Sequence, residues 1–166
     1  MRIFLGLSAA IAAIAVLSWI LNSVSYKYLK GRILRRQTWD LNICCGKTDG
    51  GGVNADIARH ASIPRFVRVG DITRLPFRDG QFGTVLCSHT IEHVEDPDRF
   101  FAELRRVGRE VTLIIPPLWD ISAVLNVFEH RWIFLSWKKE HRRLPRFIRL
   151  PLARFVQRVL GQRVRA

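Results

Sequence analysis

The sequence predicts an α/β domain with a parallel, doubly wound sheet, preceded by one transmembrane helix. Three observations carry this prediction. An uncharged run opens the chain, short apolar runs separated by polar loops follow from residue 39 onward, and an amphipathic helical pattern lies between the last two runs. Continuous apolar strands that alternate with helices or loops are typical of parallel sheets with both faces covered.

The N-terminal run, residues 3–24, contains 22 residues without a charge. At about 1.5 Å per residue a helix of this length crosses a bilayer core. The basic side chains are concentrated on its C-terminal side, which places the rest of the chain in the cytoplasm. We therefore expect residues 1–36 to form a single-pass anchor with a basic juxtamembrane segment. The alternative is a cleaved signal peptide, but the run is long for one and no small-residue cleavage site precedes Tyr26.

The net charge of +13 is concentrated at the two ends of the chain. Residues 1–36 carry +6 and residues 137–166 carry +9, whereas residues 37–136 carry −2. This distribution suits a membrane surface better than nucleic acid, so we expect no nucleic-acid partner, and a tethered nucleic-acid binder remains a distant alternative. The three cysteines include no C-x-x-C pair, which favours a reducing compartment.

The middle region, residues 37–136, is expected to hold the α/β domain. A helix should begin after Asp96 as N-cap, with Pro97 in its first turn and apolar residues on one face. The predicted strands are residues 40–45, 53–57, 66–72, 83–88 and 110–116.

Polar or small residues stand where these strands end. They are Cys45–Gly46, Asp56, Asp71 and Ser88–His89. In parallel sheets ligands bind beyond the carboxyl ends of the strands, and an acid at the end of the second strand can accept both hydroxyls of a ribose. Taken singly, Gly46 could be a turn, Asp56 a helix cap and Asp71 a surface acid. Their order at successive strand ends favours a nucleoside-like ligand.

Three stretches carry a family resemblance: "LNICCGKTDGGGVNADI", "GDITRLPFRDGQFGTVLCSHTIEHVEDPDRFFAELRRV" and "VTLIIPP". Together, over about residues 39–117, they resemble the class I S-adenosylmethionine-dependent methyltransferases of type 11, through "LPF", "EHV-D" and "E-x-x-R-V". The resemblance implies a Rossmann-like fold, S-adenosylmethionine as cofactor and methyl transfer. Combined with the anchor, it predicts a membrane-bound enzyme whose acceptor is a small or lipid-like molecule.

The resemblance also implies roles at matching positions. Cys45 and Gly46 would lie under the methionine moiety, Asp56 would hold the ribose, Asp71 with Ile72 would face the adenine, and Ser88 with His89 would flank the cofactor. The departures are a compressed first loop, Thr48 in place of a glycine, Gly83 in place of an aspartate, and no clear sixth and seventh strands after Pro117. They keep open a non-catalytic binding or scaffold subunit, and they leave open whether the C-terminal third completes the sheet.

The letters His-x-x-Glu-His at His89, Glu92 and His93 also spell a zinc-protease motif. Such a site needs a stable helix and a third ligand, and Pro97 leaves little room for a helix. Glu129 and Glu140 could be proposed as third ligands but have no supporting motif. We therefore expect no metal site, and assign no catalytic residue. His93 is either a general base or structural.

Residues 137–166 are expected to form a basic amphipathic segment. Leu152, Phe155, Val156, Val159 and Leu160 recur at helical spacing, with Arg154, Arg158 and Arg163 on the other side. This pattern predicts contact with an anionic leaflet, the alternative being a terminal helix packed on the domain. The aromatic stretch before it, with Trp119, Trp132 and Trp137, is either core, a cap over the acceptor pocket, or a surface that dips into lipid.

Overall fold

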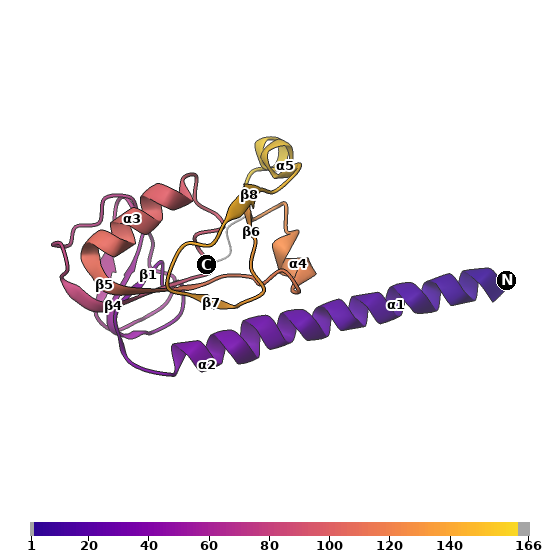
Figure 1. The fold of residues 1–166 in the computed structure, drawn as a ribbon, viewed down its shortest axis with the longest axis horizontal. Coiled ribbons are helices and arrows are strands. Elements are labelled where there is room, and N and C mark those ends of the chain that lie inside the picture. Colours follow the sequence, from indigo (N-terminus) through magenta and orange to yellow (C-terminus); the bar gives the residue numbers. More distant parts are fainter. Residues whose placement is uncertain (1, 163–166) are drawn as a thin grey trace.

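The computed structural model describes residues 2–162, so the predicted outward-facing Arg163 lies outside the described residues. Its centre is a six-stranded sheet in the order β3-β2-β1-β4-β5-β7 (Figure 1). The first five strands are parallel and β7 is antiparallel to β5. The strands are β1 (Trp39–Ile43), β2 (Gly51–Asp56), β3 (Phe66–Arg68), β4 (Phe82–Ser88), β5 (Gly108–Ile114) and β7 (Glu140–His141).

The apolar residues of the central strands β1, β2 and β4 lie side by side in the sheet. Leu41 of β1 lies beside Val53 on one side and Val85 on the other. Leu41 and Val85 are completely buried, as expected for strands covered on both faces. The predicted mixed α/β class with a mainly parallel sheet is confirmed.

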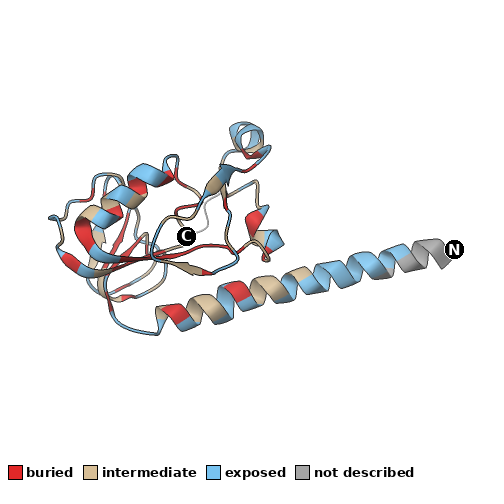
Figure 2. Cartoon of the chain, viewed as in Figure 1, coloured by how far each residue is buried: buried red, intermediate tan, exposed pale blue. Residues whose placement is uncertain are grey.

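Helix α3 (Pro97–Val107) covers one face of the sheet. Its N-cap is Asp96, whose carboxylate accepts a hydrogen bond from the main-chain N–H of Arg99 at 2.9 Å, as predicted. Phe100 and Leu104 are fully buried against the strands. Figure 2 shows this buried stripe on the inner side of an otherwise exposed helix.

The opposite face is covered by the end of the N-terminal helix. Helix α2 (Lys30–Leu34) places Ile33 against Trp39, Leu86 and Ile114. The described chain has no helix between β1 and β2 or between β2 and β3. The N-terminal segment therefore occupies a face that crossover helices usually cover.

Ahead of α2, helix α1 (Arg2–Ser23) and the π-helical turn η1 (Val24–Leu29) continue in one line and extend away from the domain (Figure 1). Within the described residues, Ala10–Leu34 is one helix long and apolar enough to cross a membrane by length and composition. Only 6% of its apolar window is buried, although Ile33 near its end joins the core. The amide of Asn22, near the end of α1, donates to Asp120 of the domain at 3.2 Å.

The C-terminal third contains strands that the sequence analysis did not find. Besides β7, β6 (Trp132–Phe134) and β8 (Phe147–Arg149) form a separate antiparallel pair. The sequence showed no clear sixth and seventh strands after Pro117 and left open whether this third completes the sheet. In the structure β7 extends the sheet, and strands of two or three residues are too short to show a period. Two short helices complete the chain, α4 (Ile121–Val124) and α5 (Ala153–Leu160).

Candidate functional site

The carboxyl ends of β1 and β2 are tied together by the first loop. The main-chain N–H of Gly46 donates to Asp56 Oδ2 at 2.9 Å, and that of Cys45 donates to the carbonyl of Ala55 at 3.2 Å. Gly46, Cys44 and His89 all have positive φ, at 55°, 52° and 52°. Non-glycine residues in the left-handed conformation are uncommon and concentrate at functional sites. Cys44 and His89 therefore give the ends of β1 and β4, where the cofactor is expected, an unusual backbone.

Asp56 is held firmly at the end of β2. Its Oδ1 accepts from the N–H of Ile57 at 2.7 Å, its Oδ2 accepts from Gly46, and its residue is 6% exposed. Among the described residues no helix lies between Asp56 and β3, so the helix-cap alternative is wrong. Each carboxylate oxygen keeps a further lone pair, which is the acceptor that a ribose hydroxyl requires.

Asp71 lies in the exposed loop after β3, and Ile72 beside it packs on the core. The Asp71 carboxylate accepts from the hydroxyl and the N–H of Thr73, at 2.8 and 2.7 Å, and these hydrogen bonds lower its pKa. It is therefore a carboxylate at neutral pH, with Oδ2 available to a donor such as an exocyclic amine.

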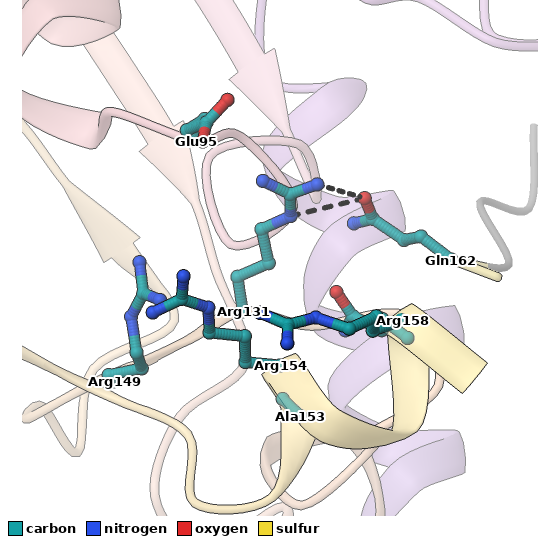
Figure 3. Close-up of a pocket in the computed structure, with 8 residues that line it drawn as sticks. Glu95, Arg131, Arg149, Ala153, Arg154, Arg158 and Gln162 are labelled. Carbon is teal, nitrogen blue, oxygen red and sulfur yellow. Dashed lines mark hydrogen bonds between the residues drawn. The ribbon is translucent and has the colours of Figure 1, made fainter. Parts of the chain in front are cut away.

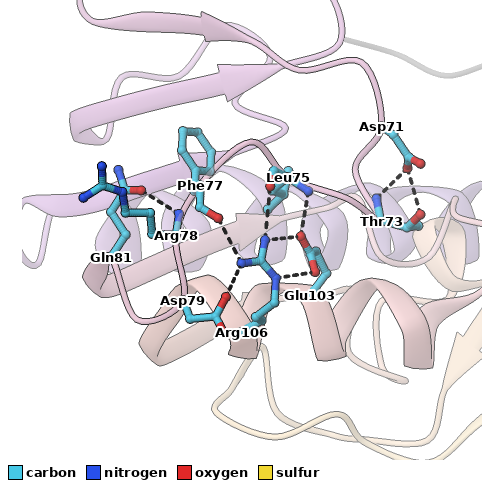
Figure 4. A network of polar contacts seen from close by, with 9 residues as sticks. All are labelled: Asp71, Thr73, Leu75, Phe77, Arg78, Asp79, Gln81, Glu103 and Arg106. Carbon is cyan, nitrogen blue, oxygen red and sulfur yellow. Dashed lines mark hydrogen bonds and ion pairs between the residues drawn. The ribbon is translucent and has the colours of Figure 1, made fainter.

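The loop that carries Asp71 is clamped by two residues of α3 (Figure 4). Arg106 donates to Glu103 and to the carbonyls of Leu75 and Phe77, at 2.6, 3.1 and 2.9 Å. Glu103 in turn accepts from the N–H of Leu75 at 2.6 Å. The "LPF" and "E-x-x-R-V" motifs are thus one structural unit, a connection that their spacing in the sequence could not reveal.

At the end of β4, Ser88 and His89 differ in their surroundings. The hydroxyl of Ser88 is buried and has no hydrogen-bond partner among the described residues, which fits a ligand group at this edge. The ring of His89 lies 3.1 Å from Glu92 Oε1 through Nδ1 and 2.8 Å from Lys139 Nζ through Nε2. Burial lowers the pKa of His89 to about 4, so the ring is neutral at pH 7.

Lys139 and Ser25 were missed in the sequence analysis, and no local pattern marks either residue. Lys139 is buried, and burial lowers its pKa to about 8. Its ammonium donates to Ser25 Oγ at 2.9 Å and to His89 Nε2, which requires His89 Nδ1–H to donate to Glu92. The N-terminal helix therefore contacts the predicted cofactor edge directly, and Tyr26 also lies beside His89, with ring centroids 5.1 Å apart.

These residues fit S-adenosylmethionine by the chemistry of their donors and acceptors. Two carboxylates suit its hydroxyls and amine, and the unpartnered Ser88 hydroxyl offers a further contact. Cys45 contributes its backbone and a buried thiol, whose pKa burial raises to about 11, so it is a neutral contact.

A second cluster lies further along the same loop. Glu92, His93 and His130 each offer one ligand atom, and the three atoms lie within 4.8 Å of one another. The third member is His130, and neither Glu129 nor Glu140 takes its place. His89, the other half of the sequence motif, is not part of this set.

A basic pocket of about 420 Å³ lies beside α5 (Figure 3). Its charged and polar lining comes from Glu95, Arg131, Arg149, Arg154, Gln157, Arg158 and Gln162. Gln162 holds Arg131 by hydrogen bonds of 2.9 and 3.1 Å. The remaining guanidinium groups give the pocket a strongly positive character suited to an anion.

Comparison with known proteins tests the resemblance. Residues 47–115 match the family model of a methyltransferase domain. The predicted resemblance is confirmed over this segment. The match includes Asp56, Asp71, Ile72, Ser88 and His89, while Cys45 and Gly46 precede it. S-adenosylmethionine is the cofactor that the methyltransferase family implies.

Among curated relatives, ajmaline N-methyltransferase of Rauvolfia serpentina is 43% identical over 47 residues, and norajmaline N-methyltransferase of the same plant is 49% identical over 40 residues. These segments cover 28% and 24% of this chain, but only 16% and 14% of the two enzymes.

Among solved structures, a methyltransferase from Aquifex aeolicus has 11% identity and a TM-score of 0.43, covering 58% of this chain and 68% of that chain. The PH0226 protein from Pyrococcus horikoshii has 20% identity and a TM-score of 0.42, covering 82% and 75%. Likenesses at these scores add nothing to the family match.

Proposed function

We propose that this protein is a membrane-anchored, S-adenosylmethionine-dependent methyltransferase that acts on an amphiphilic acceptor at the cytoplasmic leaflet. One observation carries the proposal. Two carboxylates, Asp56 and Asp71, and an unpartnered buried hydroxyl, Ser88, follow successive strands of a parallel sheet inside the segment that matches the methyltransferase family. Ligands of such sheets bind beyond these strand ends.

In this proposal the chain acts mainly by positioning. When bound, S-adenosylmethionine supplies an activated methyl group on its sulfonium. Asp56 accepts hydroxyls of the ribose, Asp71 accepts the adenine amine, and the backbone of Cys45–Gly46 lies under the methionine moiety. Ile72 contributes an apolar contact. Ser88 and His89 flank the cofactor after β4.

His89 is a positioning residue rather than a base. Its Nε2 accepts from the Lys139 ammonium and its Nδ1–H donates to Glu92, so both ring nitrogens are engaged and the ring is fixed. Holding an acceptor in line with a methyl donor can remove a large part of the activation barrier of a bimolecular transfer. The proposed reaction therefore needs no catalytic base from His89.

The membrane part of the proposal rests on three features that share one end of the domain. Figure 1 shows α4 and α5 at the end from which α1 extends. Both helices expose apolar side chains, including Ile121 at 58% and Phe155 at 68%. The basic pocket adjoins α5 and offers guanidinium groups to anionic headgroups. An amphiphilic acceptor would reach the sheet edge from this side.

The length of the anchor is consistent with this placement. The domain is bonded, through Asp120, to α1 at Asn22. The roughly 20 residues before it span about 30 Å, the thickness of a bilayer core. The catalytic domain would then lie directly at the cytoplasmic surface.

The test is calorimetric titration of S-adenosylmethionine and S-adenosylhomocysteine into the full chain in lipid nanodiscs. We expect binding that Asp56→Asn weakens by about 10- to 100-fold, from the loss of charge-assisted hydrogen bonds. Asp71→Ala provides a second variant, because this exposed side chain bonds only within its own loop and its loss should leave the fold intact. Asp98→Ala, an exposed acid on α3, is the matched control.

A non-catalytic binding module is the second candidate, and specific observations favour it. The β1–β2 connection has no helix, so no helix N-terminus faces the ligand edge there, and both oxygens of Asp56 already accept main-chain hydrogen bonds. If the folded protein bound neither S-adenosylmethionine nor S-adenosylhomocysteine, the methyltransferase proposal would fail and the non-catalytic module would remain.

A further inference from the structure

We propose that Glu92, His93 and His130 form a binding site for a divalent transition-metal ion, with Zn²⁺ as its first choice. This proposal departs from the expectation, drawn from the sequence, that the chain has no metal site. It does not rest on the proposed methyl transfer, because the three residues are distinct from those assigned to the cofactor.

The three side chains converge from two distant parts of the chain. Glu92 and His93 lie in the loop after β4, and His130 lies just before β6. Their ligand atoms are within 4.8 Å of one another, and the rings of His93 and His130 meet edge to face with centroids 4.8 Å apart. Zn²⁺ bonds of about 2.1 Å would require these atoms to be about 3.4 Å apart, which small side-chain rotations can supply.

Glu92 is the residue that points most strongly to a ligand. It is 1% exposed, and its Oε2 is buried without a hydrogen-bond partner among the described residues. A buried, unpartnered carboxylate oxygen is costly, and proteins normally avoid one by pairing it or by coordinating a metal. Glu92 Oε1 is already engaged by His89, which orients the carboxylate as an outer-shell partner does.

His93 is oriented in the way that a ligating histidine requires. Its Nδ1 lies 2.8 Å from the main-chain carbonyl of Glu129, which can only accept, so Nδ1 carries the proton. Nε2 therefore keeps the lone pair that a metal ion binds. A hydrogen bond from the second ring nitrogen to a carbonyl is the usual outer-shell contact of metal-bound histidines.

His130 is brought into place by the main chain around it. The N–H of Arg131 donates to the main-chain carbonyl of Glu92 at 2.8 Å. The side chain of Gln162 donates to the carbonyls of His93 and Glu129, at 3.1 and 2.9 Å, and so fastens the two loops together. His130 is itself buried, at 5% exposure.

The donor set determines the class of ion. Two imidazole nitrogens and one carboxylate oxygen suit Zn²⁺, Fe²⁺ or Co²⁺, whereas Mg²⁺ and Ca²⁺ prefer oxygen ligands only. Three protein ligands also leave one position for water or for another ligand, as in catalytic rather than structural zinc sites.

The test is titration of Co²⁺ into the chelator-treated full chain, followed by its displacement with Zn²⁺. We expect one Co²⁺ per chain, with the visible absorption of a four- or five-coordinate site, a higher melting temperature, and loss of the absorption on adding Zn²⁺. His130→Ala and Glu92→Gln should each weaken Co²⁺ binding at least 10-fold. His60→Ala, which removes an exposed histidine, is the matched control and should bind as the unaltered chain does.

Melting temperatures without metal separate loss of a ligand from loss of the fold. Glu92→Gln keeps an acceptor for His89, so the metal-free variant should melt within a few degrees of the metal-free parent. Absence of a visible cobalt band in the folded parent chain would overturn the proposal. Unchanged affinity in folded Glu92→Gln and His130→Ala would overturn it equally.

Discussion

Glu103 should stabilise the loop that carries Asp71, and its replacement by alanine measures how much. Its side chain is 11% exposed and accepts from the Leu75 N–H at 2.6 Å and from Arg106 at 2.6 and 2.9 Å. Glu103→Ala removes all three hydrogen bonds at once. The main-chain N–H of Leu75 would lose its acceptor in a partly buried position.

The magnitude follows from the kinds of bond that are lost. A charge-assisted hydrogen bond to a main-chain N–H contributes about 1.5–3 kcal/mol. The bond to Arg106, whose side chain is a third exposed, adds about 0.5–1 kcal/mol. We therefore expect Glu103→Ala to lower the free energy of unfolding by about 3 kcal/mol, which is a fall of about 10 °C in melting temperature.

Thermal unfolding followed by circular dichroism measures this change. Glu103→Gln keeps an acceptor for Leu75 and should lose roughly half as much. Glu110→Ala removes an ion pair with Arg142 in which both side chains are more than half exposed, so it should change stability by less than about 0.5 kcal/mol. Equal effects of Glu103→Ala and Glu110→Ala would refute the clamp.

Three further predictions concern pH, packing and the membrane. The hydrogen bond from Arg106 lowers the pKa of Glu103. The stability that the Glu103 carboxylate gives the fold is therefore complete above about pH 4.3 and is lost as the pH falls through the folded-state pKa. In an acid titration, Glu103→Gln should lose less folding stability than the parent. A Cβ at Gly52 would lie 2.3 Å from the Trp39 carbonyl, so Gly52→Ala should cost about 3 kcal/mol in urea unfolding, whereas Gly70→Ala, with open space around it, should cost almost nothing. In anionic vesicles Phe155→Cys should react several-fold more slowly with a water-soluble maleimide than in neutral detergent, and equal rates would argue against membrane contact by α5.

The sheet could be predicted from the sequence because its strands carry their own signal. The apolar runs around Leu41, Val85 and Leu113 are buried on both faces, so each is recognisable without its neighbours. Asp56 was proposed on the same basis and is the last residue of β2, whereas Asp71 lies in the loop beyond β3, which ends at Arg68 and not at the predicted residue 72.

The rest depends on contacts between distant residues, which local patterns do not encode. Ile33 covers a sheet face only because α2 packs beside β1, β4 and β5. Lys139 reaches Ser25 across 114 positions of sequence, and β7 has just two residues. The need for glycine at position 52 is likewise a tertiary effect, because a Cβ there would meet the backbone of β1.

The cluster of Glu92, His93 and His130 also depends on residues that are distant in the sequence. The His-x-x-Glu-His motif was rejected because no helix and no third ligand were evident. His130 supplies a third candidate ligand through a loop contact, and Glu129 contributes its main-chain carbonyl rather than its side chain. A motif defined by helical spacing therefore missed a cluster formed by tertiary structure.

The most direct test of the central claim is transfer of a radioactive methyl group from S-adenosylmethionine to lipids extracted from membranes that contain the full chain. The account predicts labelled product from membranes with the parent chain, and a large loss of label with Asp71→Ala at equal protein abundance. A folded chain that binds S-adenosylmethionine but labels no lipid or small molecule above membranes without it would contradict the enzymatic function.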